Sequence, residues 1–202
     1  MRILHVGATG TIGTAVADAL GTRGHDVVRV GASSGNLTVD LADPASIEAL
    51  YAACGAVDAV VCTAGVARFG PLEELTDEDF RTSLANKLMG QVNLVRRGLR
   101  VVREGGSFTL TSGTLSEKPE AGTPAVAMTG AAVEAFARAA ALDLDGRWRV
   151  NAVSPGPVAD SLVARGLDPK PGIWAKDLAA YYVELVEGSQ TGEVVTAETP
   201  MV

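Results

Sequence analysis

The chain of 202 residues is long enough for one domain around a single hydrophobic core, and no second core is needed. Its composition, 47% hydrophobic with 23 glycines and 4% aromatic residues, is typical of soluble α/β proteins and excludes disordered and fibrous classes. A net charge of −7 argues against nucleic acid as a partner, because that binding draws its affinity from clustered Lys and Arg.

Apolar residues follow a pattern in which strands alternate with helices along the chain. This alternation builds right-handed βαβ units, so we predict an α/β fold with a Rossmann-type, doubly wound parallel sheet in three layers. One domain is expected to cover residues 1–202. The predicted strands are 2–6, 25–31, 57–65, 105–113, 148–158 and 192–197, and the predicted helices are 11–24, 43–54, 76–104 (one long helix or a pair), 124–144 and 175–188.

The N-terminus and the two cysteines bear on where the protein works. MRILHV is followed directly by Gly and Thr, so this apolar run is too short for a signal peptide or a membrane span. Cys54 and Cys62 have no metal-binding spacing and are expected to be reduced structural residues. We therefore expect a cytoplasmic protein that binds neither a membrane nor a metal.

The segment GATGTIG lies directly between the first predicted strand and the first predicted helix. Gly7 permits the tight turn, Gly10 lets the backbone approach a pyrophosphate, and Gly13 allows the helix to pack closely on the sheet. The N–H groups of the helix then face the anion. This context predicts a bound dinucleotide, and the alternative is a glycine-rich turn that serves packing alone. Thr9, Thr11 and Ile12 complete the predicted binding loop.

The second predicted strand ends in VRVGASSGN, which contains no acidic residue. In dinucleotide-binding domains an acid about 20 residues beyond the glycines binds the ribose 2′-hydroxyl of NAD. Ser33 and Ser34 can instead hydrogen-bond a 2′-phosphate, and the missing carboxylate removes a repulsion. We therefore predict NADP as the cofactor, with NAD as the alternative because no arginine directly follows the strand.

Together these pieces resemble the short-chain dehydrogenase/reductase family over roughly residues 1–196. VDL at 39–41 looks like the family's adenine contact, CTAG at 62–65 like its Asn-Asn-Ala-Gly, and RVNAVSPGPV at 149–158 like its Pro-Gly loop beside nicotinamide. The resemblance implies hydride transfer between nicotinamide and a carbonyl or alcohol carbon of a small molecule. It also implies that the cofactor is lined by Asp40, Leu41, Ala64, Gly65, Pro155, Gly156 and Val158.

The chain departs from the family at the residues that assist hydride transfer, which in the family are Asn, Ser, Tyr and Lys. Alignment of the helix 124–144 places Val126 at the Tyr position and Gly130 at the Lys position. Neither side chain can transfer a proton, and loss of general acid catalysis costs about 10²- to 10⁴-fold in rate. The resemblance thus implies that the chain keeps the family's cofactor-binding residues but lacks its proton-transferring Tyr and Lys.

Two residues are candidates for the missing chemistry. The family's Asn falls on Lys87, with Asn86 one residue earlier as the alternative. A lysine in a partly desolvated pocket can act as an acid or electrostatic donor. The alternative interpretation is that Lys87 is an ordinary lysine on the surface of a helix. The family's Ser falls on Gly113, and Ser112 beside it can bind either a substrate oxygen or its own strand-end backbone. Lys87 and Ser112 are therefore the predicted catalytic residues.

The resemblance extends to partners and leaves three functions open. Helices 91–104 and 125–144 correspond to those with which the family builds dimers and tetramers, so we expect a homodimer or homotetramer. The preferred function is an NADP-dependent reductase with an atypical site, because the cofactor carries the hydride chemistry. The alternatives are a non-redox enzyme of the same fold, such as a cyclase, lyase or isomerase, and an inactive NADP-binding sensor or structural protein.

Overall fold

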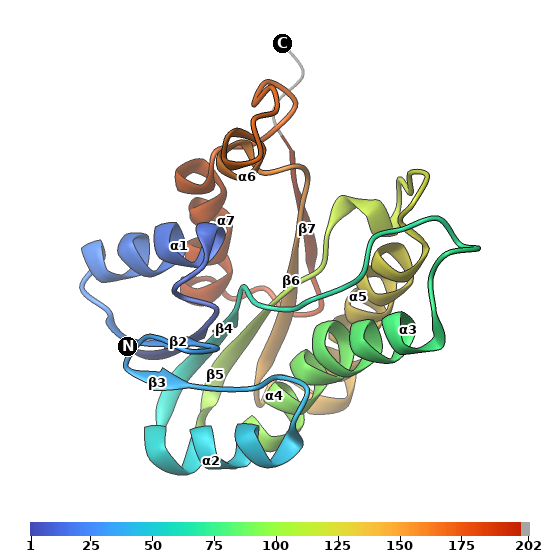
Figure 1. Ribbon diagram of the computed structural model, residues 1–202. Helices are drawn as coiled ribbons and strands as arrows, with labels where there is room; N and C mark the ends of the chain where they lie inside the picture. The colour runs from blue at the N-terminus through green and yellow to red at the C-terminus, as the bar shows by residue number, and fades with distance from the viewer. Residues whose placement is uncertain (199–202) are drawn as a thin grey trace.

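Residues 1–198 are described by a computed structural model, in which a seven-stranded sheet lies between two layers of helices (Figure 1). All neighbouring strands are parallel, in the order β3-β2-β1-β4-β5-β6-β7. The order reverses between β1 and β4, so the predicted doubly wound, Rossmann-type fold is confirmed. Residues 199–202 of the predicted domain lie outside the described residues. The strands are β1 (Arg2–Val6), β2 (Asp26–Gly31), β3 (Leu37–Thr38), β4 (Val57–Cys62), β5 (Val102–Thr111), β6 (Arg149–Pro155) and β7 (Val194–Ala197).

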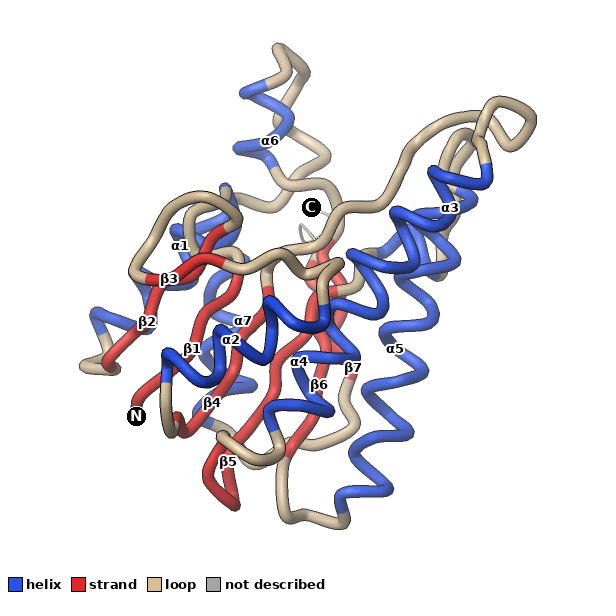
Figure 2. The backbone as a smooth tube through the Cα atoms, turned by 60° about the horizontal axis from the view of Figure 1, so that its bottom comes forward, coloured by secondary structure: helices blue, strands red, loops and turns tan. Residues whose placement is uncertain are grey.

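The helices cover both faces of the sheet. On one face α1 (Thr11–Thr22) packs against α7 (Ala175–Glu187), with the short α6 (Ala159–Ala164) beyond the end of the sheet (Figures 1 and 2). On the other face lie α2 (Pro44–Cys54), α4 (Gly90–Gly98) and α5 (Pro124–Leu144), and α3 (Asp77–Ser83) packs against α5. Asp43 caps the N-terminus of α2, because its Oδ1 accepts a hydrogen bond from Ala45 N at 2.9 Å.

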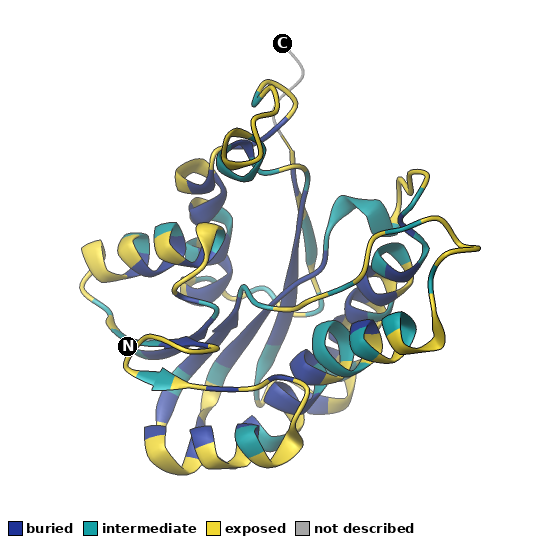
Figure 3. Cartoon of the chain, viewed as in Figure 1, coloured by how far each residue is buried: buried dark blue, intermediate teal, exposed yellow. Residues whose placement is uncertain are grey.

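The prediction of a single hydrophobic core is wrong, because each face of the sheet has its own core. In β1, Leu4 and Val6 face the core beneath α2, α4 and α5, whereas Ile3 faces the core beneath α1 and α7. This alternation follows from the two-residue period of a strand, and it buries the central strands on both sides (Figure 3). The outer faces of the helices remain exposed (Figure 3), so the apolar runs in the sequence correspond to the middle layer.

The predicted helix 76–104 is where the structure differs most from expectation. It is a helical pair joined by a π-helical segment, Leu84–Met89, and it ends at Gly98, so that β5 already begins at Val102. A Cβ atom on Gly98 would lie 2.6 Å from both Phe108 Cε1 and Tyr51 Oη, so the chain packs flush against the sheet here. A turn closed by the hydrogen bond from Val101 N to Gly98 O, at 2.8 Å, then leads into the strand.

Helix α5 is long and rich in alanine and other apolar residues. Among residues 1–198 it is the one helix long and apolar enough to cross a membrane by length and composition alone. However, Val133, Ala137 and Ala141 are buried inside the protein. The small apolar side chains of α5 therefore serve its packing against the sheet.

Candidate active site

A first cavity opens at the carboxyl ends of β1, β2 and β4, at the point where the strand order reverses. Doubly wound sheets bind their ligands at such a point. The cavity holds about 490 Å³. Seven predicted cofactor residues line it: Gly7, Thr9, Gly10, Asp40, Leu41, Ala64 and Gly65. The structure adds residues that the sequence did not single out for this role: Val6, Gly31, Ala32, Val39, Thr63, Val66 and Asn86.

The glycine turn has the geometry of a pyrophosphate cradle. Gly7 has φ +91°, and a Cβ atom on Gly13 would overlap Gly7 O, so these two glycines are required by the fold itself. A Cβ atom on Gly10 would approach only Gly7 O, at 3.5 Å. Packing therefore does not require glycine at position 10, and its bare backbone leaves room for a ligand. No side chain caps the first turn of α1 within residues 1–198, so its N–H groups remain available to an anion.

Other predicted cofactor residues lie outside this cavity. Thr11 is exposed in the first turn of α1, and Ile12 packs against the core beneath that helix. Ser33 and Ser34 are exposed in the loop between β2 and β3, so their contact with a 2′-phosphate stays a prediction. At the end of β2, a Cβ atom on Gly31 would lie 2.5 Å from Thr9 Oγ1, so no side chain fits there.

A second cavity, of about 470 Å³, lies at the carboxyl ends of β5 and β6. It brings together all the remaining predicted residues: Lys87, Ser112, Pro155, Gly156 and Val158. Val126 and Gly130 line the same cavity. The positions aligned with the family's Tyr and Lys therefore face the site, but they carry no group that could donate a proton.

Lys87 reaches this cavity from the π-helical segment Leu84–Met89. Its neighbour Asn86 lines the first cavity, where its Oδ1 accepts a hydrogen bond from Val66 N at 2.7 Å. The stem of Lys87 passes Gly65, because a Cβ atom there would lie 2.6 Å from Lys87 Cδ. π-Helical turns are rare and frequently mark functional sites. Here the turn presents one residue to each cavity, so Lys87 and not Asn86 joins Ser112.

Two influences act on the pKa of Lys87. Burial lowers this pKa because desolvation disfavours the charged ammonium, and the nearby Cys62 thiol opposes the shift. A lysine whose pKa moves down from its ordinary value releases a proton more readily at neutral pH. The amine is thus suited to proton donation, unlike a lysine on a surface helix.

The hydroxyl of Ser112 is held in place by the backbone of the next strand. Ser112 Oγ donates to Val153 O at 3.4 Å, while the residue also lines the second cavity. Among residues 1–198 no tyrosine lines this cavity, and Tyr182 is fully buried in the core, where its hydroxyl lies 2.8 Å from Thr111 Oγ1. Lys87 and Ser112 share the cavity with the hydroxyls of Thr114 and Ser161.

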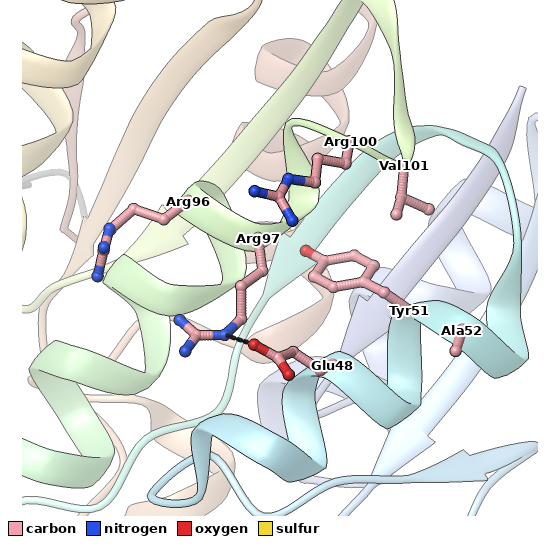
Figure 4. A pocket seen from close by; sticks show the side chains of 7 residues that line it. All are labelled: Glu48, Tyr51, Ala52, Arg96, Arg97, Arg100 and Val101. Atoms are coloured by element: carbon pink, nitrogen blue, oxygen red, sulfur yellow. Dashed lines mark hydrogen bonds and ion pairs between the residues drawn. The ribbon is translucent and has the colours of Figure 1, made fainter.

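A third hollow, of about 420 Å³, lies between α2 and α4, away from the carboxyl ends of the strands (Figure 4). Arg97 is directed at Glu48 and pairs with it at 3.0 Å, whereas Arg96 points away (Figure 4). Arg100 also lines the hollow. None of the predicted site residues lines this hollow.

The parallel sheet, the glycine turn and the adjoining cavities are features of the class of proteins that bind nucleotides at a Rossmann-type switch point. A family model described as Enoyl-(Acyl carrier protein) reductase matches residues 7–190. The chain is 31% identical over 182 residues to a versicolorin reductase of Emericella nidulans, covering 77% of this chain and 68% of that protein. The chain therefore belongs to the short-chain dehydrogenase/reductase family, as its motifs predicted.

Solved structures support the same assignment. A Listeria innocua protein is 38% identical with a TM-score of 0.92, and the match covers 97% of this chain and 98% of that chain. A small-chain dehydrogenase in complex with NADPH is 29% identical with a TM-score of 0.85, covering 98% and 96%. The fold and the family are thus shown both by sequence and by structure.

Proposed function

We propose that the protein is an NADP-dependent oxidoreductase that acts on a carbonyl or alcohol group of a small molecule, with Lys87 and Ser112 in the catalytic site. One observation carries the proposal. Lys87 and Ser112 line one cavity, and the stem of Lys87 passes Gly65, which lines the nucleotide cavity. A substrate oxygen that lies next to the bound nucleotide would need polar partners where the two cavities meet, and Lys87 and Ser112 can supply them.

Several residues of the nucleotide cavity support NADP as the cofactor. The bare backbone at Gly10 and the uncapped start of α1 would hold the pyrophosphate, and bound NADPH would supply the hydride. Gly31 leaves no room for a side chain at the end of β2, and Ala32 beside it lines the cavity without a charge. The absence of a carboxylate at these two positions favours NADP over NAD. NADPH is also bound by a solved relative.

Lys87 would act on the oxygen of the substrate carbonyl. In the reductive direction, its ammonium group donates a proton to that oxygen as negative charge develops there. Burial lowers the pKa of Lys87, which makes this transfer easier near neutral pH. The hydroxyl of Ser112, whose bond to Val153 O is long at 3.4 Å, would turn to the same oxygen and donate a second hydrogen bond to it. In the oxidative direction the neutral amine takes the proton back.

The test combines cofactor binding with turnover. NADPH binding is measured by fluorescence, and NADPH oxidation is followed with a panel of aldehydes, ketones and quinones. We expect Lys87→Ala to bind NADPH with unchanged affinity and to lose about 10²- to 10⁴-fold in kcat. We also expect the wild-type rate to fall as pH rises through the lowered pKa of Lys87, because the proton donor is then lost. Lys87→Arg, which stays charged, should shift that fall to higher pH.

Two other results would redirect the proposal. Equal activity in Lys87→Ala would remove Lys87 from the mechanism. Tight NADPH binding without oxidation across the panel would favour an NADP-binding sensor or a non-redox enzyme, because Val126 and Gly130 supply no proton donor to the cavity.

We further propose that the protein is cytoplasmic, which agrees with its two free, buried cysteines, and that it forms a homodimer or homotetramer.

A further inference from the structure

Five charged side chains line the second cavity, and two of them neutralise each other. Lys118 Nζ contacts both carboxylate oxygens of Glu198, at 2.9 and 3.2 Å. This leaves three groups that can act on a ligand: the half-buried Lys87 in the interior, and the exposed Arg165 and Glu120 at the rim. Unpaired positive charge therefore exceeds unpaired negative charge in this cavity, although the chain as a whole carries a net charge of −7.

The backbone at Arg165 is held by hydrogen bonds at the end of α6, and its side chain is exposed. The residue directly follows α6, where Arg165 N donates to Leu162 O at 3.0 Å and Leu167 N donates to the same oxygen at 2.9 Å. No carboxylate of residues 1–198 pairs with its guanidinium. Arginine keeps its charge at all physiological pH values and offers a planar fork that matches a carboxylate. Arg165 is thus a ready recognition group for an anion.

Apart from its charged residues and the hydroxyls of Ser112, Thr114 and Ser161, the second cavity is lined by apolar residues. Leu115, Val126, Pro157 and Leu162 line the cavity, and so does Phe69, whose exposed fraction is 68%. An exposed aromatic side chain beside a cavity offers apolar surface to a ligand. The cavity thus combines the half-buried Lys87, apolar side chains and an exposed Arg165, and this combination defines a ligand of matching chemistry.

We propose that the substrate is an apolar carbonyl compound with a carboxylate, whose carboxylate binds Arg165 while its carbonyl group lies at Lys87 and Ser112. This inference rests on the function proposed above. Paired hydrogen bonds between a guanidinium and a carboxylate are strong and directional, so Arg165 selects anionic over neutral substrates. Glu120 opposes this selection from the rim, and its removal strengthens the binding of the anion.

Binding is tested with two probes that share one ring: para-carboxybenzaldehyde and its neutral methyl ester. The protein is loaded with NADP, which cannot reduce an aldehyde, and each probe is titrated by calorimetry. We expect the acid to bind more tightly than the ester. Arg165→Glu should weaken the acid roughly 10-fold or more, the scale of a lost charge-assisted hydrogen bond, and leave the ester unchanged. Glu120→Gln should tighten the acid only.

Lys170→Glu is the matched control, because Lys170 is exposed on the same segment but lines a different cavity. An equal loss of acid binding in Lys170→Glu and Arg165→Glu would overturn the assignment of Arg165. An ester that binds as tightly as the acid, or no binding of the acid, would overturn the substrate class.

Turnover of the two probes with NADPH separates this inference from the proposed function. If the acid binds in an Arg165-dependent way but NADPH is not oxidised, the substrate site is supported and the proposed reductase function is contradicted. If NADPH is oxidised with the ester but not with the acid, the reductase function is supported and the carboxylate site at Arg165 is contradicted.

Discussion

At the residue scale, His5 shows how far the interior beneath the nucleotide cavity is removed from water. It is fully buried in β1, and its Nε2 lies 3.0 Å from Thr63 Oγ1, whose residue lines the nucleotide cavity. Burial, followed by the charge of Arg29, lowers the pKa of His5 from 6.5 to about 3. The ring is therefore neutral under physiological conditions and serves the fold rather than proton transfer.

This shift predicts an acid-dependent loss of stability. Between pH 6.5 and about 3 the unfolded chain binds a proton that folded His5 does not, so the free energy of unfolding falls as the pH drops through this window. The slope from this residue is at most about 1.4 kcal/mol per pH unit. Urea titrations at several pH values would measure it, and His5→Gln should flatten the slope while keeping a hydrogen bond to Thr63. An unchanged slope in the variant would contradict this.

Residue chemistry also sets what the sequence can predict about the site. Lys87 and Ser112 could be proposed because the family alignment places Lys87 at the family's Asn position and Ser112 beside its Ser position. Their presence in one cavity depends on backbone that no pattern specifies, above all the absent side chain of Gly65 beside Lys87 Cδ. The role proposed for Arg165 could not be predicted, because it depends on the ion pair between Lys118 and Glu198, which leaves Arg165 as a cation of the cavity without a partner carboxylate among residues 1–198.

At the element scale, we expect the end of β2 to decide which dinucleotide the protein binds. Gly31 admits no side chain, so Ala32 is the residue whose substitution can introduce a carboxylate. We expect Ala32→Asp to weaken NADPH binding at least about tenfold, because like charges meet, and to strengthen NADH binding through the ribose 2′-hydroxyl. Dissociation constants of both nucleotides would show the change.

A control variant lies on the adjacent turn. Ala42 is exposed and close to Asp40 in the chain but does not line the nucleotide cavity, so Ala42→Asp should leave the ratio of the two dissociation constants unaltered. If Ala32→Asp also leaves that ratio unaltered, the 2′-phosphate does not lie at the end of β2.

The sequence predicted the secondary structure of segments with an apolar periodicity that extends over many residues. It did not predict segments whose conformation depends on packing against distant parts of the chain. The helix 124–144 and the buried strands follow from their apolar periods alone. By contrast, β3 is only two residues long and α6 six residues, so neither carries a period that a sequence could reveal. The early start of β5 depends on the close approach of Gly98 to Phe108 and Tyr51, a contact between distant segments.

At the scale of the whole molecule, the two-sided burial of the sheet made the fold predictable. Continuous apolar runs such as VDAVVC are typical of strands covered on both faces, and alternation with helices then leaves few topologies. What remains free is the outer surface of the helices. On α5, Leu142 is 82% exposed and Met128 41% exposed.

These exposed side chains predict self-association through α5. We expect sedimentation velocity to give a dimer or larger species, and Leu142→Arg to shift it toward the monomer by placing a charge in the contact. Val163, 52% exposed on α6, provides the control, because Val163→Arg should not change the sedimentation coefficient. A monomeric wild-type protein would contradict the prediction.

The π-helical turn Leu84–Met89 carries one residue more than an α-helical turn would, which is the footprint of a single insertion. Loss of one codon within it would return the stretch to a regular α-helix without moving Gly90. If the lost codon were that of Lys87, Asn86 would stand three residues before Gly90, where the lysine now stands. The two chemistries of this junction, an amine and an amide, are therefore separated by the smallest change in gene length that keeps the reading frame.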